Sequence, residues 1–188
     1  MLVILTKDEQ AKATEIGLAR RKNAREHDNA DRNNLEATDR KKALMDCVAA
    51  SGEMAFHKLL PWCRWEQQQG HPYHLPDFVA GHVQIDIKTP LQHPNEGLRG
   101  LINEAGYIKP DWAYVLVLPQ GDCAYEIVGW TWGGDLQLAP VKELQHGRPA
   151  HRMKPEVPPL RPIEELMSLT NEEYANAWRA RQPSRTGR

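Results

Sequence analysis

The sequence has few cysteines, no long apolar run and almost no net charge, and each shortage argues against a class of protein. Cys47, Cys63 and Cys123 are odd in number and share no C-x-x-C spacing, which fits reduced thiols better than a disulfide framework or zinc ribbon. No apolar run approaches membrane-helix length. The apolar start, residues 2–5, is far shorter than a signal-peptide core, so we expect a cytoplasmic protein without membrane contact. A net charge of −1 gives no global nucleic-acid signature.

Two helices are expected in the first third of the chain. Residues 7–26 are rich in Ala, Lys, Arg and Glu, which favour a helix with only weak apolar periodicity. A second helix should run over about 35–60, where Pro61 ends it. Its apolar face is predicted from residues that recur at helical spacing: Leu44, Val48, Ala55 and Leu59.

Strands dominate the middle of the chain, after an expected loop at 62–75. Residues 82–89, HVQIDIKT, alternate apolar and polar side chains, which predicts a strand with one apolar face. Residues 111–119, DWAYVLVLP, are continuously apolar and predict a central, buried strand. Residues 123–132 should pair with it through a tight turn. From residue 133 on we expect Pro-rich loops, and then a helix over 170–181.

This order of elements predicts an α+β domain with helices packed on a mixed or antiparallel sheet. A length of 188 residues suits one domain with a real core. Within it we distinguish a strand and helix arm at 1–34 and a core at 35–135. A Pro-rich extension at 136–169 and a C-terminal helix with a disordered tail at 170–188 complete the chain.

Three acids and one lysine can converge around the strand at 82–89. Alternation puts Asp86 and Lys88 on one strand face, about 7 Å apart along the strand. Asp77 precedes this strand by a turn or an adjoining strand, with a bend at residues 80–81. Glu53 lies at the margin of the second helix's apolar arc, where burial requires a partner. That partner could be Lys58 or Lys42, a base of the first helix, or a site over the sheet.

Such a set suits a divalent metal ion. Mg²⁺ takes oxygen ligands, often one or two carboxylates completed by water and phosphate. Asp77, Asp86 and the backbone carbonyl of Ile87 could hold Mg²⁺, with Mn²⁺ as a substitute. Lys88 would orient or deprotonate the attacking water and offset charge on the phosphate, and Glu53 would bind a second ion or hold a water.

These residues resemble a known family, the PD-(D/E)XK nucleases. The stretches PDF and IDIKT are similar to its signature, and GEMAFHKLL is similar to the helix that precedes it. The strands WAYVLVL and YEIVGW would complete its αβββ core, and the chain through GWTWGG looks like small phage-encoded members. The resemblance covers about residues 45–132, and the second acid is Asp where Glu is common.

The resemblance implies a restriction-endonuclease-like fold with an N-terminal helix and a Pro-rich C-terminal extension. It also implies Mg²⁺-dependent endonuclease cleavage of DNA phosphodiesters in a bacterial host, and it allows a homodimer. The implied catalytic residues are Glu53, Asp77, Asp86 and Lys88. Further side chains could surround the site or contact substrate: Gln84, His57, Arg99, Lys109, Trp62 and Trp65.

Each element also has a plainer interpretation. Asp77 could be a turn residue after Pro76, and Asp86 with Lys88 could be a solvent-facing pair on an edge strand. His57 would then be a surface histidine. At the level of function, the alternative is a catalytically inactive nuclease-like domain that binds DNA or a protein partner.

Overall fold

The chain is α+β, as the sequence predicts, and it is built on a mixed sheet of six strands. The computed structural model describes residues 1–26, 38–65, 75–91, 102–104, 108–138, 141–143, 149–152 and 160–173. The six strands lie in the order β1 (Leu2–Ile4), β7 (Ala124–Trp132), β6 (Ala113–Pro119), β4 (Val83–Lys88), β3 (Phe78–Ala80) and β2 (Arg64–Trp65). A second sheet has the order β5 (Ile102–Glu104), β9 (Pro149–Arg152) and β8 (Val141–Glu143).

The strand that carries the predicted acids is an interior strand. β4 pairs antiparallel with β3 on one side and parallel with β6 on the other. Gly81, with a positive φ of 59°, makes the tight turn between β3 and β4. β6 in turn pairs antiparallel with β7. The edge-strand interpretation of Asp86 and Lys88 is therefore wrong.

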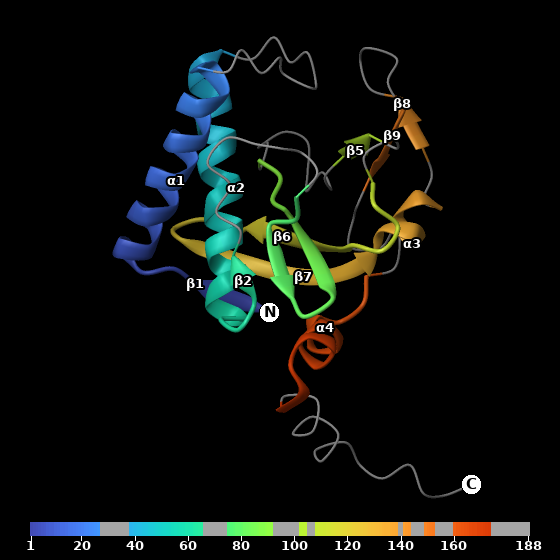
Figure 1. The fold of residues 1–188 in the computed structure, drawn as a ribbon. Helices are drawn as coiled ribbons and strands as arrows, with labels where there is room; N and C mark the ends of the chain where they lie inside the picture. Colours follow the sequence, from blue (N-terminus) through green and yellow to red (C-terminus); the bar gives the residue numbers. More distant parts are fainter. Residues whose placement is uncertain are drawn as a thin grey trace, which may run out of the picture.

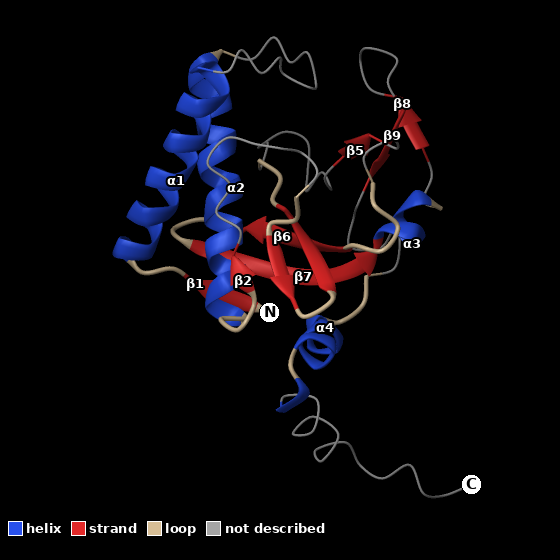
Figure 2. Ribbon diagram, viewed as in Figure 1, coloured by secondary structure: helices blue, strands red, loops and turns tan. Residues whose placement is uncertain are grey.

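The long helices α1 (Lys7–Glu26) and α2 (Asp39–Leu59) lie side by side over one face of the sheet (Figure 1). The main core fills the space between α2 and this face, where Phe56 packs against Phe78 and the apolar side chains of β4. A smaller cluster, which includes Trp112, Leu116 and Leu136, covers the other face. The short helices α3 (Gly133–Gln137) and α4 (Ile163–Thr170) stand apart from this pair (Figure 2).

Several predictions from the periodicity are confirmed. α1 spans the predicted residues, and β6 is buried on both faces from Ala113 to Leu118. In β4 the odd positions are buried and the even positions half-buried, so the polar side chains share one face. α2 begins at Asp39 rather than near 35, because the Thr38 side chain caps the helix by accepting a hydrogen bond from the Lys41 N–H.

Other predictions are wrong in specific places. Leu44 is 54% exposed, because it precedes residues 50–56, the part of α2 that is enclosed between α1 and the sheet. The expected loop at 62–75 contains β2, and the chain after 133 forms α3, β8, β9 and α4. Thr170 is the last residue of α4, and its hydroxyl donates to the Leu166 carbonyl rather than capping the next helix. Residues 172 and 173 are helical, as predicted, and the rest of the helix predicted over 170–181 lies outside the described residues.

Candidate functional site

Asp77 lies where β3 begins and holds β4 through its side chain. Its Oδ2 accepts a hydrogen bond from the Ile87 backbone N–H at 2.7 Å. The β3–β4 register pairs Phe78 with Ile85, so one further step would place Asp77 opposite Asp86. A residue in an antiparallel strand presents its N–H and C=O to the same neighbour, so the Ile87 carbonyl points to the side of β4 on which Asp77 lies. Asp77 is thus more than a turn residue.

Asp86 and Lys88 form an ion pair on the polar face of β4. The Lys88 Nζ lies 2.5 Å from Asp86 Oδ2, and the two side chains are 20% and 15% exposed. Beside them on β6, Tyr114 is the register partner of Asp86, and its ring centroid lies 5.8 Å from Lys88 Nζ. The pair is therefore largely shielded from solvent by neighbouring strands.

Glu53 enters the same region from α2 and is paired on both oxygens. Arg20 of α1 donates from Nη1 to Oε1 at 2.6 Å and from Nη2 to Oε2 at 2.7 Å. The Trp65 indole Nε1 also donates to Oε2, at 2.9 Å. The Glu53 side chain is only 5% exposed, so this two-pronged pair is shielded from water. Lys58, the other predicted partner, pairs with Glu9 instead.

Two close backbone approaches fix the helices that carry Arg20 and Glu53. A Cβ at Gly52 would lie 1.9 Å from the Thr89 Oγ1, so only glycine lets α2 approach the end of β4 this closely. A Cβ at Gly17 would lie 2.5 Å from the Cα of Cys47, so glycine there lets α1 pack against the backbone of α2. The glycines therefore place the Arg20–Glu53 pair beside the end of β4.

The neighbouring charges shift the pKa values of Asp77 and Lys88. Burial raises the pKa of Asp77 well above its ordinary range, and the carboxylates of Glu53 and Asp86 raise it further. Lys88 and the Ile87 N–H oppose this rise. Burial lowers the pKa of Lys88, but the charges of Asp86 and Asp77 outweigh burial and raise it. We call Glu53, Asp77, Asp86, Lys88 and Arg20 the acidic cluster.

Arg20 is the member of this cluster that the sequence prediction did not single out. Burial lowers the pKa of its guanidinium, but hydrogen bonds and the charge of Glu53 outweigh that effect and raise it. Asp77 acts on Arg20 in the same direction. The available signal was only the run of bases near the end of the first helix, which is also typical of a solvated helix face.

The donor set fits a divalent ion in part. Among the described residues, no group of three or more His, Cys, Asp or Glu side chains is arranged to hold a metal. Two carboxylates suffice for Mg²⁺, and burial beside other acids makes Asp77 costly to ionise without a cation. Asp77 and Asp86 therefore fit as ligands, with the Ile87 carbonyl on the same side. Glu53 does not fit while Arg20 and Trp65 occupy its oxygens.

The remaining candidates are spread around the cluster. His57 is half-buried rather than a surface residue, because its ring packs against Trp65 at 5.4 Å between centroids. Gln84 shares the half-buried face of Asp86. The Lys109 backbone N–H donates to the Tyr114 hydroxyl at 2.9 Å. Arg99 lies outside the described residues.

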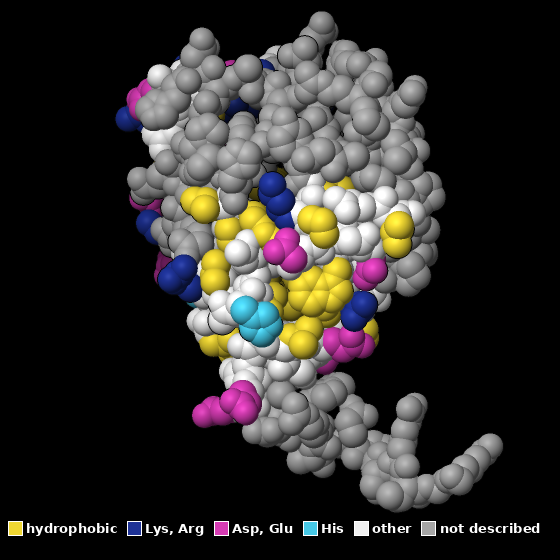
Figure 3. All heavy atoms as spheres, turned by 45° about the vertical axis from the view of Figure 1, so that its right-hand side comes forward, with side chains coloured by type: hydrophobic (Ala, Val, Ile, Leu, Met, Phe, Trp, Pro, Cys, Tyr) yellow, Lys and Arg dark blue, Asp and Glu magenta, His cyan; other side chains and the backbone are white. Residues whose placement is uncertain are grey.

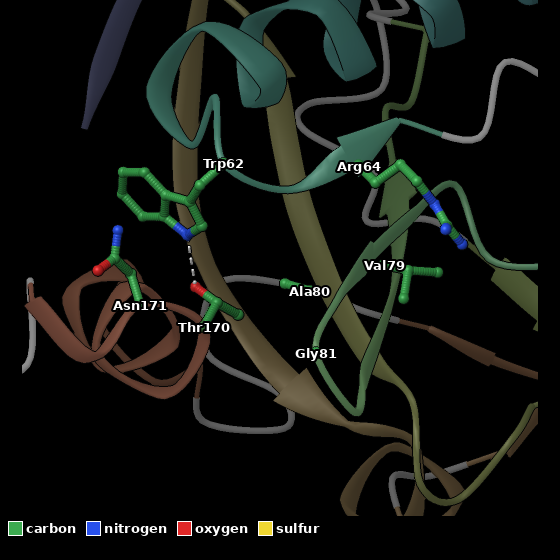
Figure 4. Close-up of a pocket in the computed structure, with 7 residues that line it drawn as sticks. All are labelled: Trp62, Arg64, Val79, Ala80, Gly81, Thr170 and Asn171. Atoms are coloured by element: carbon green, nitrogen blue, oxygen red, sulfur yellow. Dashed lines mark hydrogen bonds between the residues drawn. The ribbon is translucent and has the colours of Figure 1, made fainter.

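Trp62 lies elsewhere, in a pocket of about 500 Å³ at the far end of the β3–β4 hairpin. Its indole donates to the Thr170 hydroxyl at 3.1 Å, which joins the loop after α2 to the end of α4 (Figure 4). The pocket is lined by Trp62, Arg64, Val79, Ala80, Gly81, Thr170 and Asn171. None of these residues belongs to the acidic cluster. Trp62 therefore lies at the pocket, whereas Trp65 contacts Glu53 of the cluster.

The distribution of surface charge does not indicate a binding site for a charged partner on the face drawn in Figure 3. On the face seen in Figure 3, the described Lys, Arg, Asp and Glu side chains are scattered among hydrophobic ones. Interspersed charges of both signs give a weak mean attraction for a polyanion. Any phosphate preference of this part of the surface would therefore have to come from a local site.

No helix within the described ranges has the length and apolar character needed to cross a membrane.

Comparisons with known proteins do not assign the chain to a family. No family model, no curated protein and no solved structure matches it.

Proposed function

We propose that the protein is a Mg²⁺-dependent nuclease that hydrolyses DNA phosphodiester bonds at the acidic cluster. The observation that carries the proposal is geometric: Asp77 accepts a hydrogen bond from the Ile87 N–H, between Asp86 and Lys88, which form an ion pair. Glu53 lies near enough for its charge to act on Asp77. These side chains come from the start of β3, from α2 and from β4. Chance surface charges would have no reason to meet around one half-buried carboxylate.

The arrangement of elements is compatible with the expected restriction-endonuclease-like core. A helix, α2, precedes the β3–β4 hairpin, and β6 follows as a parallel neighbour of β4. Asp77 stands at the start of one hairpin strand, and Asp86 and Lys88 stand in the other. This is where the resemblance to PD-(D/E)XK nucleases expects them.

Asp77 and Asp86 would hold the ion, which when bound lowers the pKa of a water and neutralises phosphate charge. Lys88 keeps its proton, because Asp86 and Asp77 raise the pKa of its ammonium. A permanently charged lysine stabilises negative charge on the phosphate oxygens. In this arrangement Lys88 acts through its charge and does not accept a proton.

A cleavage assay tests the proposal directly. Plasmid and single-stranded DNA are incubated with Mg²⁺, Mn²⁺ or EDTA and with wild type, Asp86→Asn or Lys88→Met. We expect metal-dependent cleavage by wild type and a loss on the order of 100-fold or more in both variants. Lys58→Met is the matched control, because Lys58 pairs with Glu9, outside the acidic cluster, and should leave cleavage unchanged. Equal activity of Asp86→Asn and wild type would refute the assignment.

A second candidate function is a catalytically inactive nuclease-like domain that binds DNA. It is favoured by the pairing within the cluster, where Arg20 occupies Glu53 and Lys88 occupies Asp86. Such a domain would bind DNA in a salt-dependent way without cutting it. Filter binding at low and at high salt, run beside the cleavage assay, separates the two functions.

A further inference from the structure

Arg20 of α1 pairs with Glu53, and this pair affects which carboxylates can bind a metal ion. We infer that Arg20 keeps Glu53 out of the coordination of the divalent ion, so that the site holds one ion through Asp77 and Asp86. Arg20 is thus a positioning residue in α1. The inference rests on the proposed function, because it takes the acidic cluster to be a metal site.

The hydrogen bonds of Glu53 leave it little capacity to bind an ion. Its Oε2 accepts from both Arg20 Nη2 and Trp65 Nε1, and its Oε1 accepts from Arg20 Nη1. A carboxylate oxygen has two lone pairs, so Oε2 is fully used. Oε1 keeps one lone pair, but a cation bound there would lie beside the Arg20 guanidinium, a like charge held in a pair whose side chains are only 17% and 5% exposed. Moving Arg20 away to relieve this repulsion would leave its half-buried charge without a partner.

The charge of the cluster also suits a single ion. Three carboxylates, Glu53, Asp77 and Asp86, face two cations, Arg20 and Lys88. One divalent ion reverses the net negative charge, and a second would add to an already positive site.

The position of Arg20 is set by packing. Gly17 lies one helical turn before Arg20, and its contact with the backbone of Cys47 holds α1 against α2. Trp65 of β2 also supports Glu53 through its indole N–H, with its ring near those of His57 and Phe78. The pair is consequently held between two packed elements, not formed by mobile surface side chains.

Isothermal titration with Mn²⁺, without DNA, tests the inference. The proteins are wild type, Arg20→Met, the double variant Arg20→Met/Glu53→Gln, and Asp86→Asn. Arg25→Met is the matched control, because it also removes a base of α1 but one that pairs with Asp39. Circular dichroism and thermal melting verify that each variant is folded.

We expect one Mn²⁺ per wild-type chain and a loss of binding of at least tenfold in Asp86→Asn. Arg20→Met should free Glu53, so that a second Mn²⁺ binds or the dissociation constant falls at least tenfold. The double variant, in which both members of the pair are neutral, should return to one ion with a dissociation constant within threefold of wild type. Arg25→Met should match wild type.

The outcomes separate failure of the inference from failure of the proposed function. If wild type binds no Mn²⁺, the proposed function fails and the inference falls with it. If wild type binds and Asp86→Asn does not, but the double variant also loses tenfold or more, Glu53 is a ligand and only the inference is wrong. If Arg20→Met is unfolded, the double variant alone still decides between these outcomes.

Discussion

The Asp77 carboxylate accepts the Ile87 backbone hydrogen bond that a longer β3 would have satisfied with its own carbonyl. This bond, 2.7 Å long, closes the β3–β4 ladder with a side chain in place of a main chain. It therefore fixes a carboxylate beside Asp86 as part of building the sheet. The hydrogen bond between the Ile87 N–H and Asp77 Oδ2 thus both stabilises the sheet and positions a candidate metal ligand.

Replacing Asp77 by asparagine should change how stability depends on pH. The folded pKa of Asp77 lies well above its ordinary 3.8, so the stability it contributes is fully present below pH 3.8 and is lost as pH rises through the folded value. An asparagine at this position cannot ionise, and its amide oxygen can still accept from Ile87. Without divalent ions, Asp77→Asn should therefore gain stability relative to wild type as pH rises, by at most about 1.4 kcal/mol per pH unit.

Urea unfolding at a series of pH values from acidic to neutral measures this difference. Asp135→Asn serves as the control, because Asp135 is 48% exposed and pairs with Arg161, away from the cluster. If the free energy of unfolding of Asp77→Asn and of wild type depends on pH in the same way, the pKa of Asp77 is not raised in the folded state.

A methyl group at Gly52 should be poorly tolerated. Its Cβ would meet Thr89 Oγ1 at 1.9 Å, inside a packed interface between α2 and the end of β4. Overpacking of this kind costs about 1–3 kcal/mol. Gly134→Ala is the control, since the nearest atom to its Cβ would lie at 3.6 Å. Chemical denaturation of both variants gives the comparison, and equal stabilities would mean that α2 can shift freely.

Removing the Trp65 indole N–H should weaken the support of Glu53. Trp65→Phe keeps an aromatic ring but loses a hydrogen bond to a buried carboxylate, worth about 2 kcal/mol in the free energy of unfolding. Trp62→Phe also loses one indole bond, to a hydroxyl, from a side chain that is 36% exposed, and should cost less than about 1 kcal/mol. The prediction is contradicted if Trp62→Phe proves the more destabilising of the two.

The three thiols should react with a disulfide reagent at different rates. Burial raises the pKa of Cys63 to about 11, and burial together with Asp46 raises the pKa of Cys47. The reactive species is the thiolate, so Cys63 should be the slowest at mildly alkaline pH. Cys123 is half-buried and should react first. Loss of the fast phase in Cys123→Ser would verify the order, and its persistence would refute it.

Local patterns in the sequence were enough to predict the strands around the site. Alternation in β4 correctly placed Asp86 and Lys88 on one face, and the apolar run of β6 correctly indicated a buried strand. Both signals depend only on neighbours in the chain. β2 and β3, with two and three residues, are too short to give a periodic signal.

The partner of Glu53 could not be chosen from the sequence. Lys58 is five residues away and Arg20 is 33 residues away, and both carry the required charge. The choice is made by the close packing of α1 on α2 at Gly17, which is a tertiary contact. Similarly, α4 is hidden in a Pro-rich stretch, where its short apolar spacing of Ile163, Leu166 and Met167 gives a weak signal.

The contact between α1 and α2 has a consequence for any shortened form of the protein. A fragment starting at residue 35 would keep the strands that carry Asp77, Asp86 and Lys88, but it would lose Arg20 and expose the outer edge of β7, where β1 pairs. Glu53 would then keep the Trp65 indole as a hydrogen-bond donor but lose the positive charge that balances it. We therefore expect a fragment that lacks β1 and α1 to be less stable than the full chain, because it loses a strand pairing and the partner of a buried carboxylate.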